Sequence, residues 1–110
     1  MAVYKDSREL DSAVKRIRKM EKSFDRARAA QSRLSKAAES FMKAKEDLEA
    51  LRGYYGSEDW KKDFQADEAS ELPAELRRGV LSEDGVWDFF EENRELAETM
   101  KKLARELSKK

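Results

Sequence analysis

The sequence contains no cysteine and no histidine, two of the side chains that most often carry chemistry in proteins. Without cysteine there can be no disulfide framework and no thiolate nucleophile. Without histidine the commonest general base at neutral pH is missing, and zinc lacks its usual nitrogen and sulfur ligands. Catalysis would have to depend on carboxylates, lysine, tyrosine or serine, and the sequence brings no nucleophile, base and orienting group together. We therefore expect a protein that is not an enzyme and that uses no cofactor.

Glycine and proline are scarce and confined to one region. The four glycines and the single proline all lie between residues 53 and 85. Because these residues most often interrupt regular structure, their confinement predicts an all-α protein with two long helices. We expect one helical domain over 1–110, with a long helix over 7–52, a short-helix module over 53–82 and a last helix over 83–108. The two long helices are predicted to form an antiparallel hairpin joined by that aromatic cross-module.

Long hydrophobic runs are also absent. No stretch of about 18 apolar residues is present, which argues against a membrane-spanning helix. The N-terminal residues MAVYKDSREL lack the apolar centre of a signal peptide. With no cysteine as well, these features favour a cytoplasmic protein. An oxygen-ligand site for magnesium or calcium stays compatible with the composition.

Charge is abundant, and it is unevenly distributed along the chain. Charged residues make up 44% of the sequence and the formal net charge is zero. Residues 1–52 carry fourteen basic and nine acidic side chains. Residues 53–98 carry five basic and fourteen acidic side chains, and residues 99–110 carry five basic side chains and one acidic side chain. A basic segment and an acidic segment of this kind either pair within an assembly or bind a charged partner.

The first helix carries a seven-residue apolar repeat. Asp6 followed by Glu9 predicts a capping box at its start. Apolar residues then recur in two rows with the 3-4 spacing of a coiled coil. One row is Leu10, Ile17, Phe24, Gln31 and Ala38, and the other is Ala13, Met20, Ala27, Leu34, Phe41 and Leu48. We favour a continuous helix, although a kink near the polar residues around Gln31 is an alternative.

The two long helices differ in length. The first would be roughly 65–70 Å long and the last roughly 39 Å. A hairpin would therefore leave Leu10, Ile17 and Met20 uncovered, and an exposed apolar seam usually marks an interface. We expect a homodimer in which the N-terminal arms pair or dock on the partner's acidic module. Charge asymmetry favours the second geometry, and a kink near residue 31 would remove the need for a dimer.

The middle region is rich in turn signals and aromatic residues. Ser57 and Ser82 are predicted helix caps, and Leu81 with Val86 fits a hydrophobic staple. Gly53 is expected to end the first helix, and Pro73 to open a short helical turn. Seven aromatic residues are expected to form a small core above Leu72, Leu76 and Val80: Tyr54, Tyr55, Trp60, Phe64, Trp87, Phe89 and Phe90.

Three segments of the chain resemble a known family. The strings RIRKMEKSFD, YYGSEDWKKDF and LPAELRRGVLSEDGVWDFFEENREL are similar to the bacterial family catalogued as domain of unknown function 4298. The resemblance covers about residues 16–100. It implies a small, helical, cytoplasmic bacterial protein and implies no activity.

Two polar clusters could bind ligands. Asp59, Asp63 and Asp67 recur every four residues on one helix face, where they could hold a divalent cation or act as paired carboxylates. The alternatives are a solvated face paired with nearby lysines, or a contact with a basic protein. Arg77 and Arg78 precede the Ser82 helix start and could form a small anion pocket. Salt bridges to Glu83 or Asp84, or the local helix dipole, would also account for the arginines.

The stretch 15–36 is strongly basic, with nine basic and two acidic residues. Lys15, Arg18, Lys22 and Arg26 lie on the side opposite the apolar seam, where they could track nucleic-acid phosphates. The apolar seam runs through this region, and few residues suited to base readout accompany it. The face also lacks the apolar anchors of a membrane-binding helix.

We therefore expect a non-catalytic structural or protein-interaction module, with a protein partner or itself as ligand. The candidate partner-binding residues are Leu10, Lys15, Ile17, Arg18, Met20, Lys22, Arg26, Arg77 and Arg78. The alternative is a nucleic-acid-associated accessory protein that uses the basic face of 15–36. The sequence suggests no small-molecule substrate, metal or membrane partner.

Overall fold

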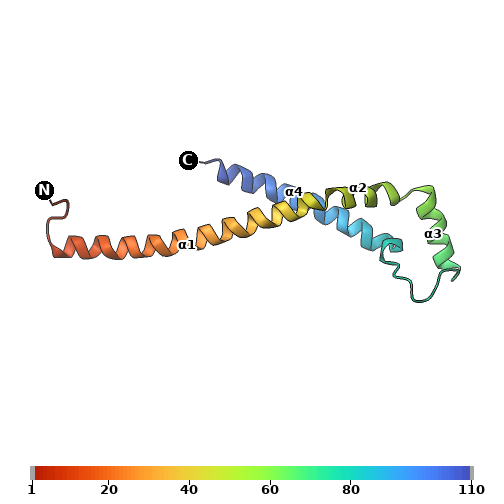
Figure 1. Ribbon diagram of the computed structural model, residues 1–110. Helices are drawn as coiled ribbons and strands as arrows, with labels where there is room; N and C mark the ends of the chain where they lie inside the picture. Colours follow the sequence, from red (N-terminus) through yellow and green to blue (C-terminus); the bar gives the residue numbers. More distant parts are fainter. Residues whose placement is uncertain (1, 110) are drawn as a thin grey trace. The chain divides into compact units, whose positions relative to one another are not determined.

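The computed structural model describes residues 2–109 and is all-α, as predicted (Figure 1). Its helices are α1 (Ser7–Lys43), α2 (Lys45–Tyr54), α3 (Glu58–Glu68), the 3₁₀ helix η1 (Gly79–Leu81) and α4 (Glu83–Leu107). The chain divides into two compact units. Unit 1 ends at Glu46 and contains α1, and unit 2 begins at Asp47 and contains α3, η1, α4 and most of α2. The predicted antiparallel pairing of the first and last helices stays a prediction.

The start of α1 has the predicted cap at Asp6, while the second bond of the capping box falls one residue earlier, on Lys5. The Asp6 carboxylate accepts a hydrogen bond from the Glu9 backbone N–H at 2.9 Å. The Glu9 carboxylate in turn accepts one from the Lys5 N–H at 3.0 Å. Two backbone donors at the helix start are thereby satisfied, which stabilises this end of α1.

The predicted helix over 7–52 is divided at Ala44. The chain is helical through Gln31, so the alternative kink near that residue is absent. At Ala44 the backbone N–H bonds instead to the Phe41 carbonyl at 3.0 Å, which closes a tighter turn than the α-helical one. Neither glycine nor proline lies there. The break therefore had no signal among the residues that usually interrupt helices.

The turn after α2 differs from the predicted one. Gly53 lies inside α2, which continues through Tyr54. The left-handed backbone conformation falls on Gly56, with φ of 81°. The prediction that Gly53 ends the helix was therefore wrong, because Gly53 keeps the helical conformation and Gly56 takes the left-handed one at the turn. Ser57 then caps α3 as predicted, accepting a hydrogen bond from the Trp60 N–H at 3.1 Å.

The end of α3 has the hydrogen bonds of a Schellman motif. The Glu71 N–H bonds to the Ala66 carbonyl at 2.9 Å, and the Ser70 N–H bonds to the Asp67 carbonyl at 3.1 Å. Ser70 holds the left-handed position, with φ of 58°, that glycine usually takes in this motif. After it, Pro73 opens a single turn closed by the Leu76 N–H at 3.1 Å.

The core of unit 2 is small and centred on Trp60. Trp60 is 9% exposed, and Leu81 and Val86 are also buried. The Trp60 Nε1–H donates to the Val80 carbonyl at 2.9 Å, which ties α3 to η1. Ser82 caps α4 as predicted, with its hydroxyl oxygen 3.2 Å from the Gly85 N–H. Leu81 and Val86, one on each side of this cap, are buried as the predicted staple requires.

Aromatic rings extend this core from α3 to α4. The Tyr55 ring lies 5.1 Å from Trp60 and 6.0 Å from Phe90, both edge-on, and Trp60 stacks on Phe64 at 5.2 Å. Phe90 also lies 5.8 Å from Phe89. These separations are typical of favourable aromatic pairs. The predicted aromatic core is thus present, but with fewer members than expected.

Four predicted core residues are exposed. Trp87 is 53% exposed, and Phe89, Leu76 and Val80 are also exposed. Trp87 follows buried Val86 directly, so the helical rotation of about 100° per residue turns it away from η1. The prediction that these four side chains are buried was therefore wrong, and only Leu72 of the expected floor is half-buried.

Candidate interaction surfaces

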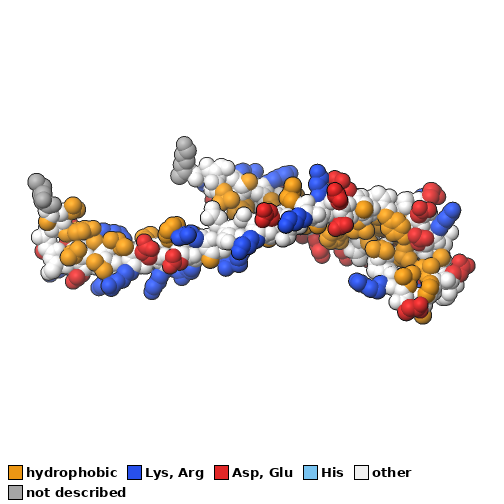
Figure 2. Space-filling view, in the orientation of Figure 1, with side chains coloured by type: hydrophobic (Ala, Val, Ile, Leu, Met, Phe, Trp, Pro, Cys, Tyr) orange, Lys and Arg blue, Asp and Glu red, His pale blue; other side chains and the backbone are white. Residues whose placement is uncertain are grey.

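The first surface is an apolar stripe on α1, formed by Leu10, Ile17, Met20 and Phe24. These side chains are 47%, 53%, 52% and 55% exposed. Their spacing of three, four and seven residues places them on one face of the helix. Figure 2 shows hydrophobic side chains along the N-terminal half of α1, beside lysines and arginines. The α1 stripe therefore offers large apolar side chains that are about half exposed to solvent.

The α1 stripe has a charged border. The Arg28 guanidinium lies 5.2 Å from the centre of the Phe24 ring, one helical turn away. This contact places a positive charge at the edge of the stripe and covers part of the Phe24 ring face. Ala13, which belongs to the same heptad pattern, is only 1% exposed and is therefore covered by its own chain.

The second surface is the basic face of α1. Lys15, Arg18, Lys22 and Arg26 are all exposed, as the sequence predicted for a solvated helix face. Heptad spacing places Lys15 and Lys22 opposite the α1 stripe. The apolar and the basic surfaces of α1 can therefore act independently.

The third surface is a groove in unit 2 between the end of α2 and the first half of α4. It is lined by Arg52, Tyr55, Trp87, Phe90, Glu91, Asn93, Arg94 and Ala97. Arg52 lies 5.9 Å over the Phe90 ring, and Arg94 forms an ion pair with Glu91 at 2.9 Å. Trp and Arg are the residue types that contribute most to protein interfaces. Exposed Trp87 at this groove therefore makes it a candidate contact surface.

Sequence reasoning missed this groove, although one signal was present. Asn93 is the polar member of the row Val86, Asn93, Met100. Its Nδ2 is buried, and no residue between 2 and 109 accepts a hydrogen bond from it. A polar residue in an apolar row typically fixes register at a cost in stability.

The aspartate ladder of α3 is engaged within unit 2. The Tyr54 hydroxyl donates to the Asp63 carboxylate at 2.6 Å. This hydrogen bond, together with desolvation and the negative charges of Asp63 and Asp59, raises the pKa of Tyr54 to about 12. Two of the three carboxylates therefore have partners in unit 2, since Asp67 pairs with Arg78.

The two candidate arginines have different roles. The Arg78 guanidinium lies 2.7 Å from the Asp67 carboxylate, and both side chains are partly buried. Arg78 thus connects the end of α3 to the start of η1, rather than bonding to Glu83 or Asp84 as the sequence had suggested. Arg77 is exposed to solvent.

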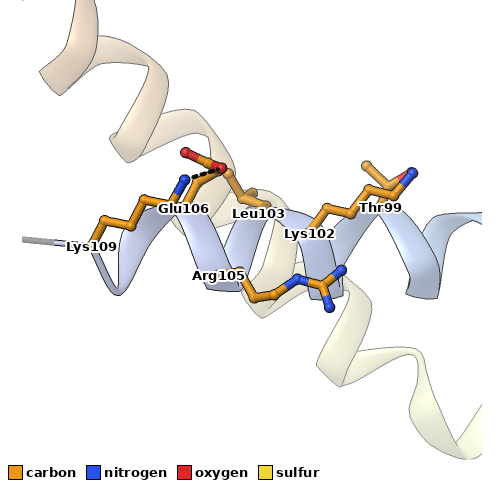
Figure 3. A pocket seen from close by; sticks show the side chains of 6 residues that line it. All are labelled: Thr99, Lys102, Leu103, Arg105, Glu106 and Lys109. Atoms are coloured by element: carbon orange, nitrogen blue, oxygen red, sulfur yellow. Dashed lines mark hydrogen bonds and ion pairs between the residues drawn. The ribbon is translucent and has the colours of Figure 1, made fainter.

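The last turns of α4 form a shallow, open surface. Its lining comes from the end of α4 and from Lys109 just after it: Thr99, Lys102, Leu103, Arg105, Glu106 and Lys109 (Figure 3). Lys109 Nζ lies 2.8 Å from the Glu106 carboxylate. With walls from one helix only, this surface offers no enclosed site for a small molecule.

A metal site requires clustered ligand side chains, and a membrane-spanning helix requires a long apolar stretch. Within residues 2–109, no three His, Cys, Asp or Glu side chains lie close enough together to hold a metal ion. Over the same residues, no helix is long and apolar enough to span a membrane.

Comparison with known proteins identifies the family. The family model described as "Domain of unknown function (DUF4298)" matches residues 17–103. This match spans most of the chain and includes α2, α3, η1 and the greater part of α1 and α4. The chain therefore belongs to this family, as its sequence resemblance indicated. No curated protein and no solved structure matches the chain.

Proposed function

We propose that this member of the DUF4298 family is a non-catalytic protein-interaction module that acts in the cytoplasm through its helical surfaces. The observation that carries the proposal is the α1 stripe. Four large apolar side chains on one face of α1 are about half exposed. Leaving them in water costs free energy that a partner helix would recover, at about 25 cal/mol per Å² of apolar surface buried.

The preferred partner is a second copy of this chain, bound through α1. The stripe has the spacing of a coiled-coil seam, and such seams bind other helices with the same repeat. The absence of cysteine supports the cytoplasmic assignment, since cytosolic proteins seldom depend on disulfides.

Sedimentation velocity tests the proposal. The double variant Leu10→Asp/Ile17→Asp places two charges in the stripe, and we expect it to lose self-association and to lose capture of protein partners. The matched control is Ser12→Asp/Lys19→Asp, which has the same seven-residue spacing on exposed positions outside the stripe. If both variants self-associate as strongly as the wild type does, the stripe has no role in self-association.

The alternative function is nucleic-acid binding by the basic face of 15–36. The exposure of Lys15, Arg18, Lys22 and Arg26 favours it. Such a binder should shift a duplex in a gel at about 50 mM salt and lose affinity steeply as salt rises. Replacing the four residues by glutamine should abolish that shift, whereas the Leu10→Asp/Ile17→Asp variant should retain it. No shift of wild type at low salt would exclude this function.

A further inference from the structure

We infer that α1 pairs antiparallel with α1 of a second copy, in a register that sets Phe24 of each copy against Ala27 of the other. This inference rests on the proposed function and specifies its partner, orientation and register. Its evidence is the exposure of the seam between Ile17 and Leu34 and the order of charges along the edge of that seam.

The open part of the seam is symmetric about its centre. One row of the heptad contains Ile17, Phe24 and Gln31, and the other contains Met20, Ala27 and Leu34. Of these residues only Leu34 is half-buried, and the rest are exposed. The segment from Ile17 to Leu34 is about 27 Å long and lies in the middle of α1.

Antiparallel pairing about this centre matches large side chains with smaller or complementary ones. Phe24 meets Ala27 of the second copy, so the largest side chain faces the smallest. Ile17 meets Leu34 and Met20 meets Gln31, and each contact occurs twice because the pair is two-fold symmetric. The alternation of large and small residues is what close packing of two helices requires.

Charges at the edge of the seam select this register. Glu21 and Arg28 lie seven residues apart on the same edge, and the Arg28 guanidinium already lies beside the seam over Phe24. In the proposed register Glu21 faces Arg28 of the second copy at both ends. A shift of one heptad in either direction would set Glu21 against Glu21, or Arg28 against Arg28. Edge charges of this kind determine partner and orientation in coiled coils.

The other edge and the basic face do not oppose the pairing. The opposite edge sets Ser23 against Ala30, which are both uncharged. Lys15 and Lys22 lie on the far side of the helix, where they stay in solvent. The basic charge of 15–36 is therefore compatible with pairing of two α1 helices.

Parallel pairing is less favourable. It would set Phe24 against Phe24 and Ala27 against Ala27. Layers of two large side chains would then alternate with layers of two small ones, and the helices could not pack evenly. It would also join both copies of the acidic unit 2 at one end, each with seventeen acidic and eleven basic residues over 47–110. Antiparallel helices in addition place the positive end of each dipole near the negative end of the other.

Charge exchange tests the register. We expect Glu21→Arg alone and Arg28→Glu alone each to raise the dimer Kd about tenfold, because each change creates two like-charge contacts. The double variant should restore the wild-type Kd, and an equimolar mixture of the two single variants should form heterodimers. A parallel pair would instead set Glu21 near Arg16, so rescue of Glu21→Arg by Arg16→Glu would overturn the inference.

Disulfide trapping tests the orientation, and the absence of native cysteine makes it clean. The variant Met20→Cys/Gln31→Cys should oxidise to a covalent dimer, whereas either single variant should not. In the antiparallel pair two copies of the same residue would lie about 16 Å apart, too far for a disulfide. Covalent dimers from the single variants would overturn the inference.

The two proposals fail in different ways. Wild-type protein that sediments as a monomer at micromolar concentration would overturn the self-pairing inference. The proposed function would survive that result if the α1 stripe captured a different protein and the Leu10→Asp/Ile17→Asp variant did not.

Discussion

Unit 1 and unit 2 are both helical and differ in what stabilises their helices. In unit 2, the rings of Tyr55 and Phe64 contact Trp60, and the Trp60 indole N–H donates to the carbonyl of Val80, twenty residues away. In unit 1, α1 is stabilised by its cap at Asp6 and by contacts along the same helix, such as Arg28 with Phe24. The large apolar side chains that are buried, Trp60, Leu81 and Val86, lie in unit 2, whereas those of the α1 stripe are about half exposed.

The two units differ in whether their own chain covers the apolar faces of their helices. Most of the stability of a helix in a protein comes from packing of its apolar face, and propensity adds less. Unit 2 supplies that packing from its own chain through α3, η1 and α4. The α1 stripe has exposed side chains that a second molecule can cover. In the proposed function, unit 2 provides the folded core and α1 provides the binding surface.

The largest expected effect is at Trp60. Trp60→Ala should lower the free energy of unfolding of unit 2 by about 3–5 kcal/mol, since it removes a buried aromatic side chain. Urea unfolding followed by circular dichroism measures this change. Trp87→Ala is the matched control, and because Trp87 is half exposed its cost should be below about 1 kcal/mol. Equal costs for the two tryptophans would contradict the core described for unit 2.

The next effect compares two glycines on either side of the end of α2. Gly56→Ala should destabilise unit 2 by about 1–2 kcal/mol, because Gly56 has φ of 81°. Gly53→Ala should stabilise it by about 0.5–1 kcal/mol, because Gly53 lies inside the helix. A Cβ at either position would meet nothing within 4 Å, so the opposite signs would come from backbone conformation alone. Thermal melts of both variants measure the difference.

A smaller gain is expected at the end of α3. Ser70→Gly should stabilise unit 2 by about 0.5 kcal/mol, since glycine adopts the left-handed conformation without the cost that a Cβ adds. Ser70→Ala serves as the control and should give no gain, because alanine carries the same Cβ. Chemical unfolding of the wild type and the two variants measures these differences. A loss of stability in Ser70→Gly would show that the Ser70 backbone is not strained.

The last effect appears only at high pH and concerns Tyr54. Its neutral hydroxyl is bonded to Asp63, which raises its pKa from about 10 to about 12. This interaction should stabilise the fold below pH 10 and be lost as pH rises towards 12. In an ultraviolet titration of phenol ionisation, the absorbance change that is lost in Tyr54→Phe should have its midpoint at about pH 12. Asp63→Asn should lower that pKa more than Asp59→Asn, and equal shifts would contradict the hydrogen bond.

Local signals predicted the start of each capped helix. The caps at Asp6, Ser57 and Ser82 are present because a short polar side chain can satisfy the first free N–H groups from its own position. The family was also readable from the sequence, because the strings that resemble it lie at residues 16–25, 54–64 and 72–96, and the family model matches residues 17–103. The α1 stripe followed from the heptad spacing alone.

Other features depended on contacts that no local pattern describes. Trp60 and Trp87 are the same residue type, each near the start of its helix, and the direction of each side chain relative to η1 makes one buried and the other exposed. The bond from Tyr54 to Asp63 and the ion pair from Arg78 to Asp67 join residues about ten positions apart across turns. The groove with Asn93 likewise requires two helices to be placed side by side.

The sequence by itself determined the helical class, the positions of the caps and the apolar and basic faces of α1, because these depend on residues within one or two helical turns. The tertiary structure alone decided which aromatic side chains form a core, which glycine makes the turn and which carboxylates are already paired. Those outcomes depend on the direction in which the chain leaves each turn, and that direction is set by packing between elements that are distant in sequence.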